Sequence, residues 1–280
     1  MKKTNLILIA LMALIFVSCS EDETTMSMPK DNAIEFGTYL GRDAQTRASV
    51  LTTKTMATDG FGVFAYYTDQ VKWDEYSSKG TANFMDNLKV TSKTNGATWT
   101  YSPIKYWPNN DGAMVTFLAY APWVEGKTIT EEAKVNFKVE NSIKAQTDLV
   151  WNTENHIDAK KDKLSGNVNF KFNHALARIG LKLEAAVDKV DAGGRLDKNT
   201  TITVNSVTLG STLKDSIEVK QFYTGGTLDL TKTTAVWDPV EGMQAFVFNT
   251  TNGNLQNNVI KGASHINAKQ LNTDDSYLMV

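Results

Sequence analysis

Cysteine is nearly absent from this chain. The 280 residues contain one cysteine, Cys19, and three histidines. A single thiol cannot form an intramolecular disulfide, and it leaves no cysteine pair for a metal site. The fold must therefore be held by the burial of apolar side chains, and the hydrophobic fraction of 41% is large enough to supply a packed core.

Excess charge of one sign and long apolar runs are also lacking. The formal net charge is -2 and no basic stripe is visible, which argues against a nucleic-acid-binding protein. The run from Leu6 to Val17 is about a dozen residues long, too short to span a bilayer but typical of a signal-peptide core behind a basic start. We therefore expect residues 1–18 to be a signal peptide.

Cys19 lies at the end of this apolar run, and the acidic stretch 20–23 follows it. A cysteine in this place resembles the lipobox of bacterial lipoproteins, in which the thiol takes a diacylglycerol and becomes the new N-terminus. The residue three positions earlier is Phe16, where the usual box has leucine. The alternative is a plain secretory signal with an incidental cysteine. The lipobox interpretation predicts that residues 19–32 form a lipidated tether and that the outer membrane is reached only through this lipid.

The first strand pattern follows the tether. Residues 34–40 alternate, with Ile34, Phe36 and Leu40 on one face. The polar stretch 41–48 then separates this strand from the rest of the chain and contains Arg47. The predicted order is anchor, tether, strand, basic loop and body.

The body has the pattern of an all-β protein. Short apolar segments recur at roughly 8–12-residue spacing and are separated by turn signals such as Asn95-Gly96. This pattern predicts β-sandwich structure, and we place a domain division near residues 160–166, which gives domains at 33–165 and 166–280. The chain ends in mid-strand at Val280, so we expect the second domain to be incomplete. The predicted strands are residues 34–40, 61–67, 84–90, 114–122, 135–139, 146–151, 168–172, 177–183, 201–209, 216–222, 227–230 and 245–248.

Catalytic and metal-binding motifs are not found in the sequence. The three histidines share no local ligand motif, and we expect His174 to be a hydrogen-bonded structural residue. Nucleophile elbows, phosphate loops and dinucleotide fingerprints are missing as well. We therefore expect no enzyme, no cofactor and no metal. Trp73 and Trp123 lie in loop-like settings and are candidate contacts for a sugar ring, although core packing is the alternative for any tryptophan.

Four pieces of the body carry a resemblance: residues 62–66, 99–103 with 105–108, 117–122, and 146–151 followed by 170–179. Together they resemble the fimbrillin family, the Mfa-like subunits of type V pili. This resemblance implies two transthyretin-like β-sandwich domains in tandem, secretion as a lipidated precursor, and assembly with other fimbrial subunits by strand exchange. Arg47-Ala48 resembles the arginine-specific maturation site of fimbrillins. Beyond Leu183 the match is looser.

Two functions remain in competition. The first is a structural or accessory subunit of cell-surface fimbriae, in which cleavage between Arg47 and Ala48 would remove the anchor together with the strand of Ile34, Phe36 and Leu40. The strand would then be a place-holder that blocks early assembly. The alternative is a monomeric surface lipoprotein that binds a glycan or a host ligand through loop aromatic residues.

Overall fold

The computed structural model shows an all-β chain, which confirms the predicted class. The helices are the short segments α1 (Thr53–Asp59) and α2 (Lys161–Leu164), with a 3-10 turn at Trp73–Glu75. Cys19, Arg47 and Ala48 lie outside the described residues. The structure describes residues 32–40, 51–140, 142, 145–154, 156–183, 201–210, 222–239, 243–251, 255–261, 269–271 and 276–278.

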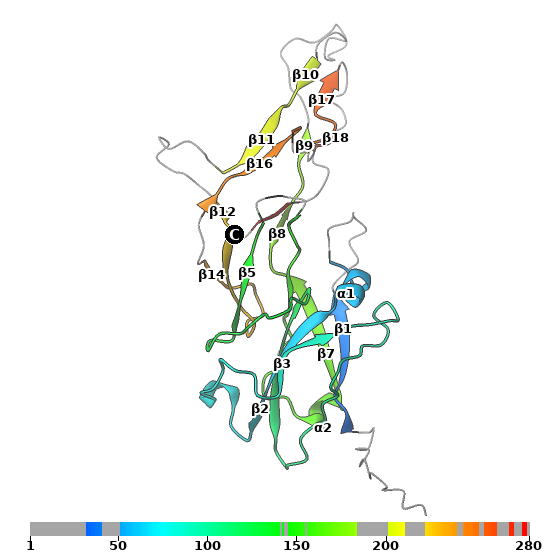
Figure 1. Ribbon diagram of the computed structural model, residues 1–280, viewed down its shortest axis with the longest axis vertical. Coiled ribbons are helices and arrows are strands. Elements are labelled where there is room, and N and C mark those ends of the chain that lie inside the picture. Colours follow the sequence, from blue (N-terminus) through cyan, green and yellow to red (C-terminus); the bar gives the residue numbers. More distant parts are fainter. Residues whose placement is uncertain are drawn as a thin grey trace, which may run out of the picture. The chain divides into compact units, whose positions relative to one another are not determined.

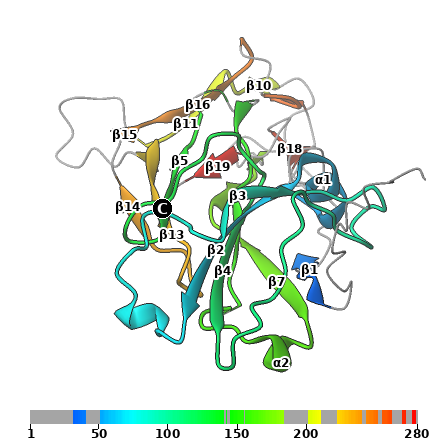
Figure 2. The same ribbon diagram turned by 60° about the horizontal axis from the view of Figure 1, so that its bottom comes forward.

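The largest sheet has six strands in the order β1-β7-β6-β4-β2-β3. β1 at its edge runs parallel to β7, whereas the other neighbours are antiparallel. Figures 1 and 2 show β1 beside β7, with α2 at the end where β7 begins. The strands are β1 (Glu35–Leu40), β2 (Phe61–Asp69), β3 (Met85–Val90), β4 (Met114–Ala121), β6 (Val150–Asn152) and β7 (Asn167–His174).

The remaining strands form smaller sheets. A three-stranded sheet has the order β14-β13-β5, and the others pair two by two. The three strands are β5 (Lys134–Lys138), β13 (Gly225–Asp229) and β14 (Trp237–Pro239). The pairs are β8 (Ala177–Ile179) with β19 (Ser276–Leu278), β9 (Lys182–Leu183) with β18 (Lys269–Gln270), β10 (Thr201–Thr203) with β17 (Val259–Lys261), β11 (Ser206–Leu209) with β16 (Phe246–Asn249), and β12 (Phe222–Tyr223) with β15 (Met243–Gln244).

Apolar cores cover both faces of the central strands. In β2, Phe61 and Val63 belong to one buried cluster, and Phe64 and Tyr66 belong to another. Successive side chains of a strand point to opposite faces, so a strand buried on both sides reads as a continuous apolar run. This explains the nearly uninterrupted run 61–67 and confirms that it is a central strand.

β7 has only one apolar face. Val168, Phe170 and Phe172 are buried in the same cluster as Phe61, while Asn169 and Lys171 are exposed. The alternation stops after His174, where Ala175 and Leu176 enter the other cluster. The chain therefore crosses from one core to the other at this point.

The sheets join strands from both sides of the predicted domain division at residues 160–166. β7 begins after it but lies between β1 and β6, and β5 lies before it but pairs with β13. Long-range pairing of this kind leaves no local signal, because a strand pattern shows which face is buried and not which strand lies beside it.

Local signals did locate the turn at Asn95-Gly96. Both residues have positive φ, 53° and 92°, as the central residues of a tight hairpin turn require, and the bridge between Thr91 and Thr100 flanks them. The predicted strand 216–222 falls almost entirely on residues outside the described part of the chain, where β12 begins at Phe222.

Candidate functional site

The candidate site is the edge of the six-stranded sheet that β1 occupies. Ile34 is 1% exposed, and Phe36 and Leu40 are each 7% exposed, whereas Tyr39 on the opposite face of the strand is 59% exposed. The predicted alternation of 34–40 is thus confirmed. The apolar side chains of β1 are as buried as those of a core strand, although β1 lies at the edge of the sheet.

Aromatic rings surround the Phe36 side chain. Its ring centroid lies 5.1 Å from that of Tyr101 and 5.4 Å from that of Phe170, on which it stacks. Phe61 and Phe117 meet it edge-on, each at 6.2 Å. We call the backbone edge of β7 together with these four rings the β1 site.

Backbone hydrogen bonds join β1 to β7, and they join the residues just before β1 to a second segment. From Glu35 to Leu40 its partner is β7, in parallel register. Before that, the Ile34 amide donates to the Lys105 carbonyl at 2.9 Å, and the Trp107 amide donates to the Asn32 carbonyl at 2.9 Å. Residues 32–34 are therefore bonded to the segment 105–107, and Glu35–Leu40 is bonded to β7.

Tyr101 adds a side-chain hydrogen bond at this start. Its hydroxyl donates to the Ile34 carbonyl oxygen at 2.7 Å. Burial raises the pKa of Tyr101 to about 12, so the hydroxyl keeps its proton and remains a donor at physiological pH.

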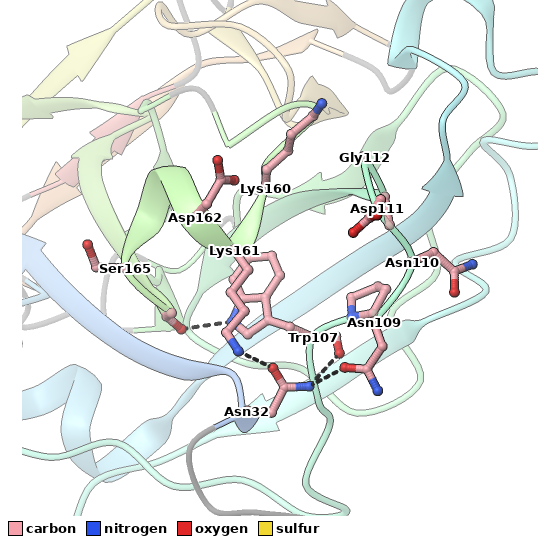
Figure 3. A pocket seen from close by; sticks show the side chains of 13 residues that line it. Asn32, Trp107, Asn109, Asn110, Asp111, Gly112, Lys160, Lys161, Asp162 and Ser165 are labelled. Atoms are coloured by element: carbon pink, nitrogen blue, oxygen red, sulfur yellow. Dashed lines mark hydrogen bonds between the residues drawn. The ribbon is translucent and has the colours of Figure 1, made fainter.

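A polar pocket of about 660 Å³ lies where β1 begins. Figure 3 shows the Asn32 carboxamide at its edge, facing Trp107 and Lys161. The Asn32 Nδ2 donates to the Trp107 carbonyl at 2.8 Å and to Asn109 Oδ1 at 3.0 Å, and Lys161 Nζ donates to Asn32 Oδ1. The pocket is lined by Asn32, Trp107, Pro108, Asn109, Asn110, Asp111, Gly112, Ala113, Lys160, Lys161, Asp162, Ser165 and Gly166.

The other end of the β1 site is tied to the chain that follows residues 41–50. Asp148 is 1% exposed, and its Oδ2 accepts the Leu51 amide at 3.0 Å and interacts with His174 Nδ1 at 2.8 Å. The hydrogen bond with Asp148 raises the pKa of His174. His174 is therefore the hydrogen-bonded structural residue that the sequence predicts. Asp148 links the end of β7 to Leu51, which follows the predicted cleavage site at Arg47-Ala48.

The two candidate tryptophans lie elsewhere and apart from the polar pocket. Trp73 is 3% exposed, with its ring 5.0 Å from that of Tyr66. Trp123 donates its Nε1 hydrogen to the Asn87 carbonyl at 3.0 Å, and Lys89 Nζ lies 4.3 Å from its ring centroid. Trp73 thus packs as a core residue, and Lys89 covers the Trp123 ring.

Metal-ligand clusters and membrane-spanning helices were sought among the described residues. No group of three or more His, Cys, Asp or Glu side chains in this part of the chain could hold a metal ion. Within the same residues, no helix is long and apolar enough to cross a bilayer.

The fold is thus all-β, and β1, the first strand that the structure describes, forms an edge of its largest sheet with a buried apolar face. A family model described as fimbrillin-like matches residues 46–274, and the chain belongs to this family.

Individual relatives agree with this assignment. The fimbrium subunit Fim1C of Phocaeicola vulgatus is 30% identical over 190 residues, which cover 62% of this chain and 49% of that protein. The chain therefore spans about half the length of this relative. A crystal structure of a fimbrial protein from Bacteroides vulgatus has the same fold, with a TM-score of 0.67, 22% identity, and coverage of 89% of this chain and 77% of that one.

The polar residues of the site were missed by the sequence analysis. Asn32, Asn109 and Lys161 come from three distant segments, and each looks like an ordinary surface residue in sequence. Asp148 was equally inconspicuous, since a single acidic residue inside a short apolar segment shows no partner. The one local signal was the position of Asn32, two residues before the first buried residue of a strand.

Proposed function

We propose that this chain is a structural or accessory subunit of cell-surface fimbriae that is exported as a lipoprotein and assembles by strand exchange. One observation carries the proposal: β1, the first described strand, is buried like a core strand but is joined to the sheet on a single backbone edge along Glu35–Leu40. Membership of the fimbrillin-like family and the name of the Phocaeicola vulgatus relative support it.

Loss of β1 would leave the β1 site in an unfavourable state. The rings of Tyr101, Phe117 and Phe170 would lose their contact with Phe36 and be exposed to water, and the edge of β7 would carry unpaired backbone groups. A strand from another subunit restores both the hydrogen bonds and the apolar burial. Assembly driven in this way needs no external energy source.

Two features of the sequence outside the described residues complete the proposal, a lipid acceptor and a cleavage site. Cys19 is the lipid acceptor that anchors the precursor in the outer membrane, where two acyl chains give stable attachment. Cleavage between Arg47 and Ala48 removes the anchor, the tether and β1 in a single step. In the precursor β1 therefore acts as a place-holder against early assembly.

From the family resemblance we further infer that the chain is organised as two transthyretin-like domains in tandem. The strand pairing of β5 with β13 and of β1 with β7 places segments from both halves of the sequence in shared sheets, so each domain would include strands from distant parts of the chain.

The test is digestion of the purified precursor with an arginine-specific protease, followed by sequencing of the new N-terminus. We expect Ala48, and multimers once full-length family partners are supplied. The chain offers a matched control, because Arg42 and Arg47 lie in the same polar segment. Arg47→Ala should abolish the Ala48 terminus, and Arg42→Ala should leave it unchanged. A cleaved protein that stays monomeric in the presence of those partners would refute strand exchange.

A further inference from the structure

A small apolar pocket with a cation at its wall lies apart from the β1 site. Its volume is about 110 Å³, and it is formed by residues of β5, of β4 with the chain that follows it, and of the chain that precedes β6. None of the lining residues belongs to the β1 site, so the pocket does not depend on exchange of β1. It is lined by Tyr120, Pro122, Val124, Lys127, Val135, Asn136, Phe137, Thr147 and Leu149.

Core side chains form the inner wall of this pocket. Tyr120, Val135 and Leu149 are buried members of one apolar cluster. The Tyr120 hydroxyl donates to Asn87 Oδ1 at 2.8 Å, so its hydrogen is already used. Water in an apolar cavity finds few hydrogen-bond partners, and an apolar group that displaces such water therefore gains affinity.

Lys127 is the cationic residue of the lining, and it is half-buried. Its Nζ donates to the backbone carbonyl of Asn136, another lining residue, at 2.7 Å, and among the described residues no carboxylate pairs with it. Burial lowers the pKa of Lys127, because the ammonium is partly removed from water without an anion beside it. An ammonium has three hydrogens to donate, so Lys127 can still bond to an anion at the pocket.

The volume of the pocket limits the apolar part of a ligand. An apolar cavity of about 150 Å³ holds benzene, which has six carbon atoms. In proportion, this pocket of about 110 Å³ holds a chain of about four carbons. A ligand that combines such a chain with a negative charge would match both the apolar wall and the Lys127 ammonium.

We propose that this pocket binds a short-chain aliphatic carboxylate with an apolar tail of about four carbons, such as pentanoate. The tail lies against Val135, Phe137 and Leu149, and the carboxylate accepts a hydrogen bond from Lys127. Charge complementarity selects this ligand over a neutral one, since hydrogen bonds between ionised groups are stronger than those between neutral groups.

The experiment is an NMR titration of the purified full chain with straight-chain carboxylates from acetate to heptanoate at neutral pH. The methyl groups of Val135 and Leu149 report on the pocket. We expect their signals to shift, with the dissociation constant falling about fourfold for each added methylene up to pentanoate. Hexanoate and heptanoate should bind no more tightly than pentanoate, because their tails exceed the volume of the pocket.

The role of the cation is tested by a ligand without charge and by a pair of lysine variants. Pentanamide should bind the wild type about tenfold more weakly than pentanoate, because it cannot form a hydrogen bond between charged groups. Lys127→Met keeps an unbranched side chain and should bind the acid and the amide equally. Lys89→Met is the matched control and should keep the preference for the acid, because Lys89 lies against the Trp123 ring and does not line the pocket.

The place of binding is tested by filling the rim of the pocket. Val124 lines the pocket and is 44% exposed, so Val124→Trp should block pentanoate without unfolding the protein. Val71 is equally exposed and does not line the pocket, so Val71→Trp should leave binding unchanged.

Three results would overturn the proposal. Unchanged methyl signals up to the solubility limit of pentanoate would show that the pocket does not take this ligand. Equal binding of acid and amide by the wild type would refute recognition of a carboxylate and would favour an apolar side chain of a partner protein as the occupant. Affinity that continues to rise through heptanoate would show that the tail binds outside the pocket.

Discussion

At the scale of single residues, Thr38 is the least satisfied position of β1. Its Oγ1 is buried without a hydrogen-bond partner in the described part of the chain, between the buried side chains of Phe36 and Leu40. A buried unpaired hydroxyl costs about 1–3 kcal/mol. The unpaired hydroxyl weakens the attachment of β1 to the sheet, which is compatible with the proposed release of this strand.

Thr38→Val should stabilise the precursor by about 1 kcal/mol, because it replaces the unpaired hydroxyl with a methyl group of similar size. The free energy of unfolding in urea measures the effect. Thr38→Ser is the control: it keeps the hydroxyl, removes a methyl group and should destabilise. A valine variant no more stable than the wild type would contradict the conclusion that the unpaired Thr38 hydroxyl destabilises β1.

His174 gives the β1 site a pH dependence. Its pKa is raised by the hydrogen bond with Asp148, against opposing contributions from burial and from the charge of Arg178. The His174 pKa in the folded protein lies above the unfolded value of about 6.5. The interaction of protonated His174 with Asp148 therefore stabilises the fold fully below that pH, and this stabilisation is lost as the pH rises through the folded pKa.

Asp148→Asn should lower the pKa of His174, and an NMR titration of the His174 ring measures this directly. The stability difference between wild type and variant should be larger at acid pH than at pH 8. The hydrogen bond from the Leu51 amide is common to both conditions and serves as the internal reference. An unchanged His174 titration would show that Asp148 is not its main partner.

At the scale of elements, two substitutions in β1 compare what its buried face and its exposed face contribute to the free energy of unfolding. Phe36→Ala should destabilise the precursor by about 3–5 kcal/mol, because it leaves a cavity among four aromatic rings. Tyr39→Ala in the same strand should change stability by less than about 0.5 kcal/mol, since that side chain is exposed. Thermal or urea unfolding compares the two. Equal effects would mean that β1 contributes through its backbone alone.

Most individual strands could be predicted because burial on one or two faces leaves a direct periodic trace. The alternation at 34–40 and 168–172 and the continuous run at 61–67 are examples, and each corresponds to a strand with the expected buried face. After His174 the apolar side chains change from one core to the other.

At the scale of the whole molecule, the proposed membrane attachment rests on Cys19. Cys19→Ala should abolish labelling by a fatty-acid probe and release or mislocalise the protein, because the chain contains no other thiol. Cell fractionation together with probe labelling measures both effects. Unchanged labelling of the variant would refute the lipoprotein proposal.

The sequence by itself determined the all-β class, the faces that the strands bury, the tight turn at Asn95-Gly96, and family membership through its local motifs. These properties depend on neighbouring residues, since side-chain alternation and turn conformations are set within a few positions along the chain.

Only the tertiary structure decided which strands pair and which polar residues meet. Three contacts join residues about 100 or more positions apart. They are the parallel pairing of β1 with β7, the hydrogen bond from Lys161 to Asn32, and the hydrogen bond from Leu51 to Asp148. Periodicity cannot encode these contacts, because a strand with one apolar face can be placed beside any edge that buries that face. The position of β1 at the sheet edge therefore came from packing of the whole chain, whereas strand exchange was already implied by the family resemblance of the sequence.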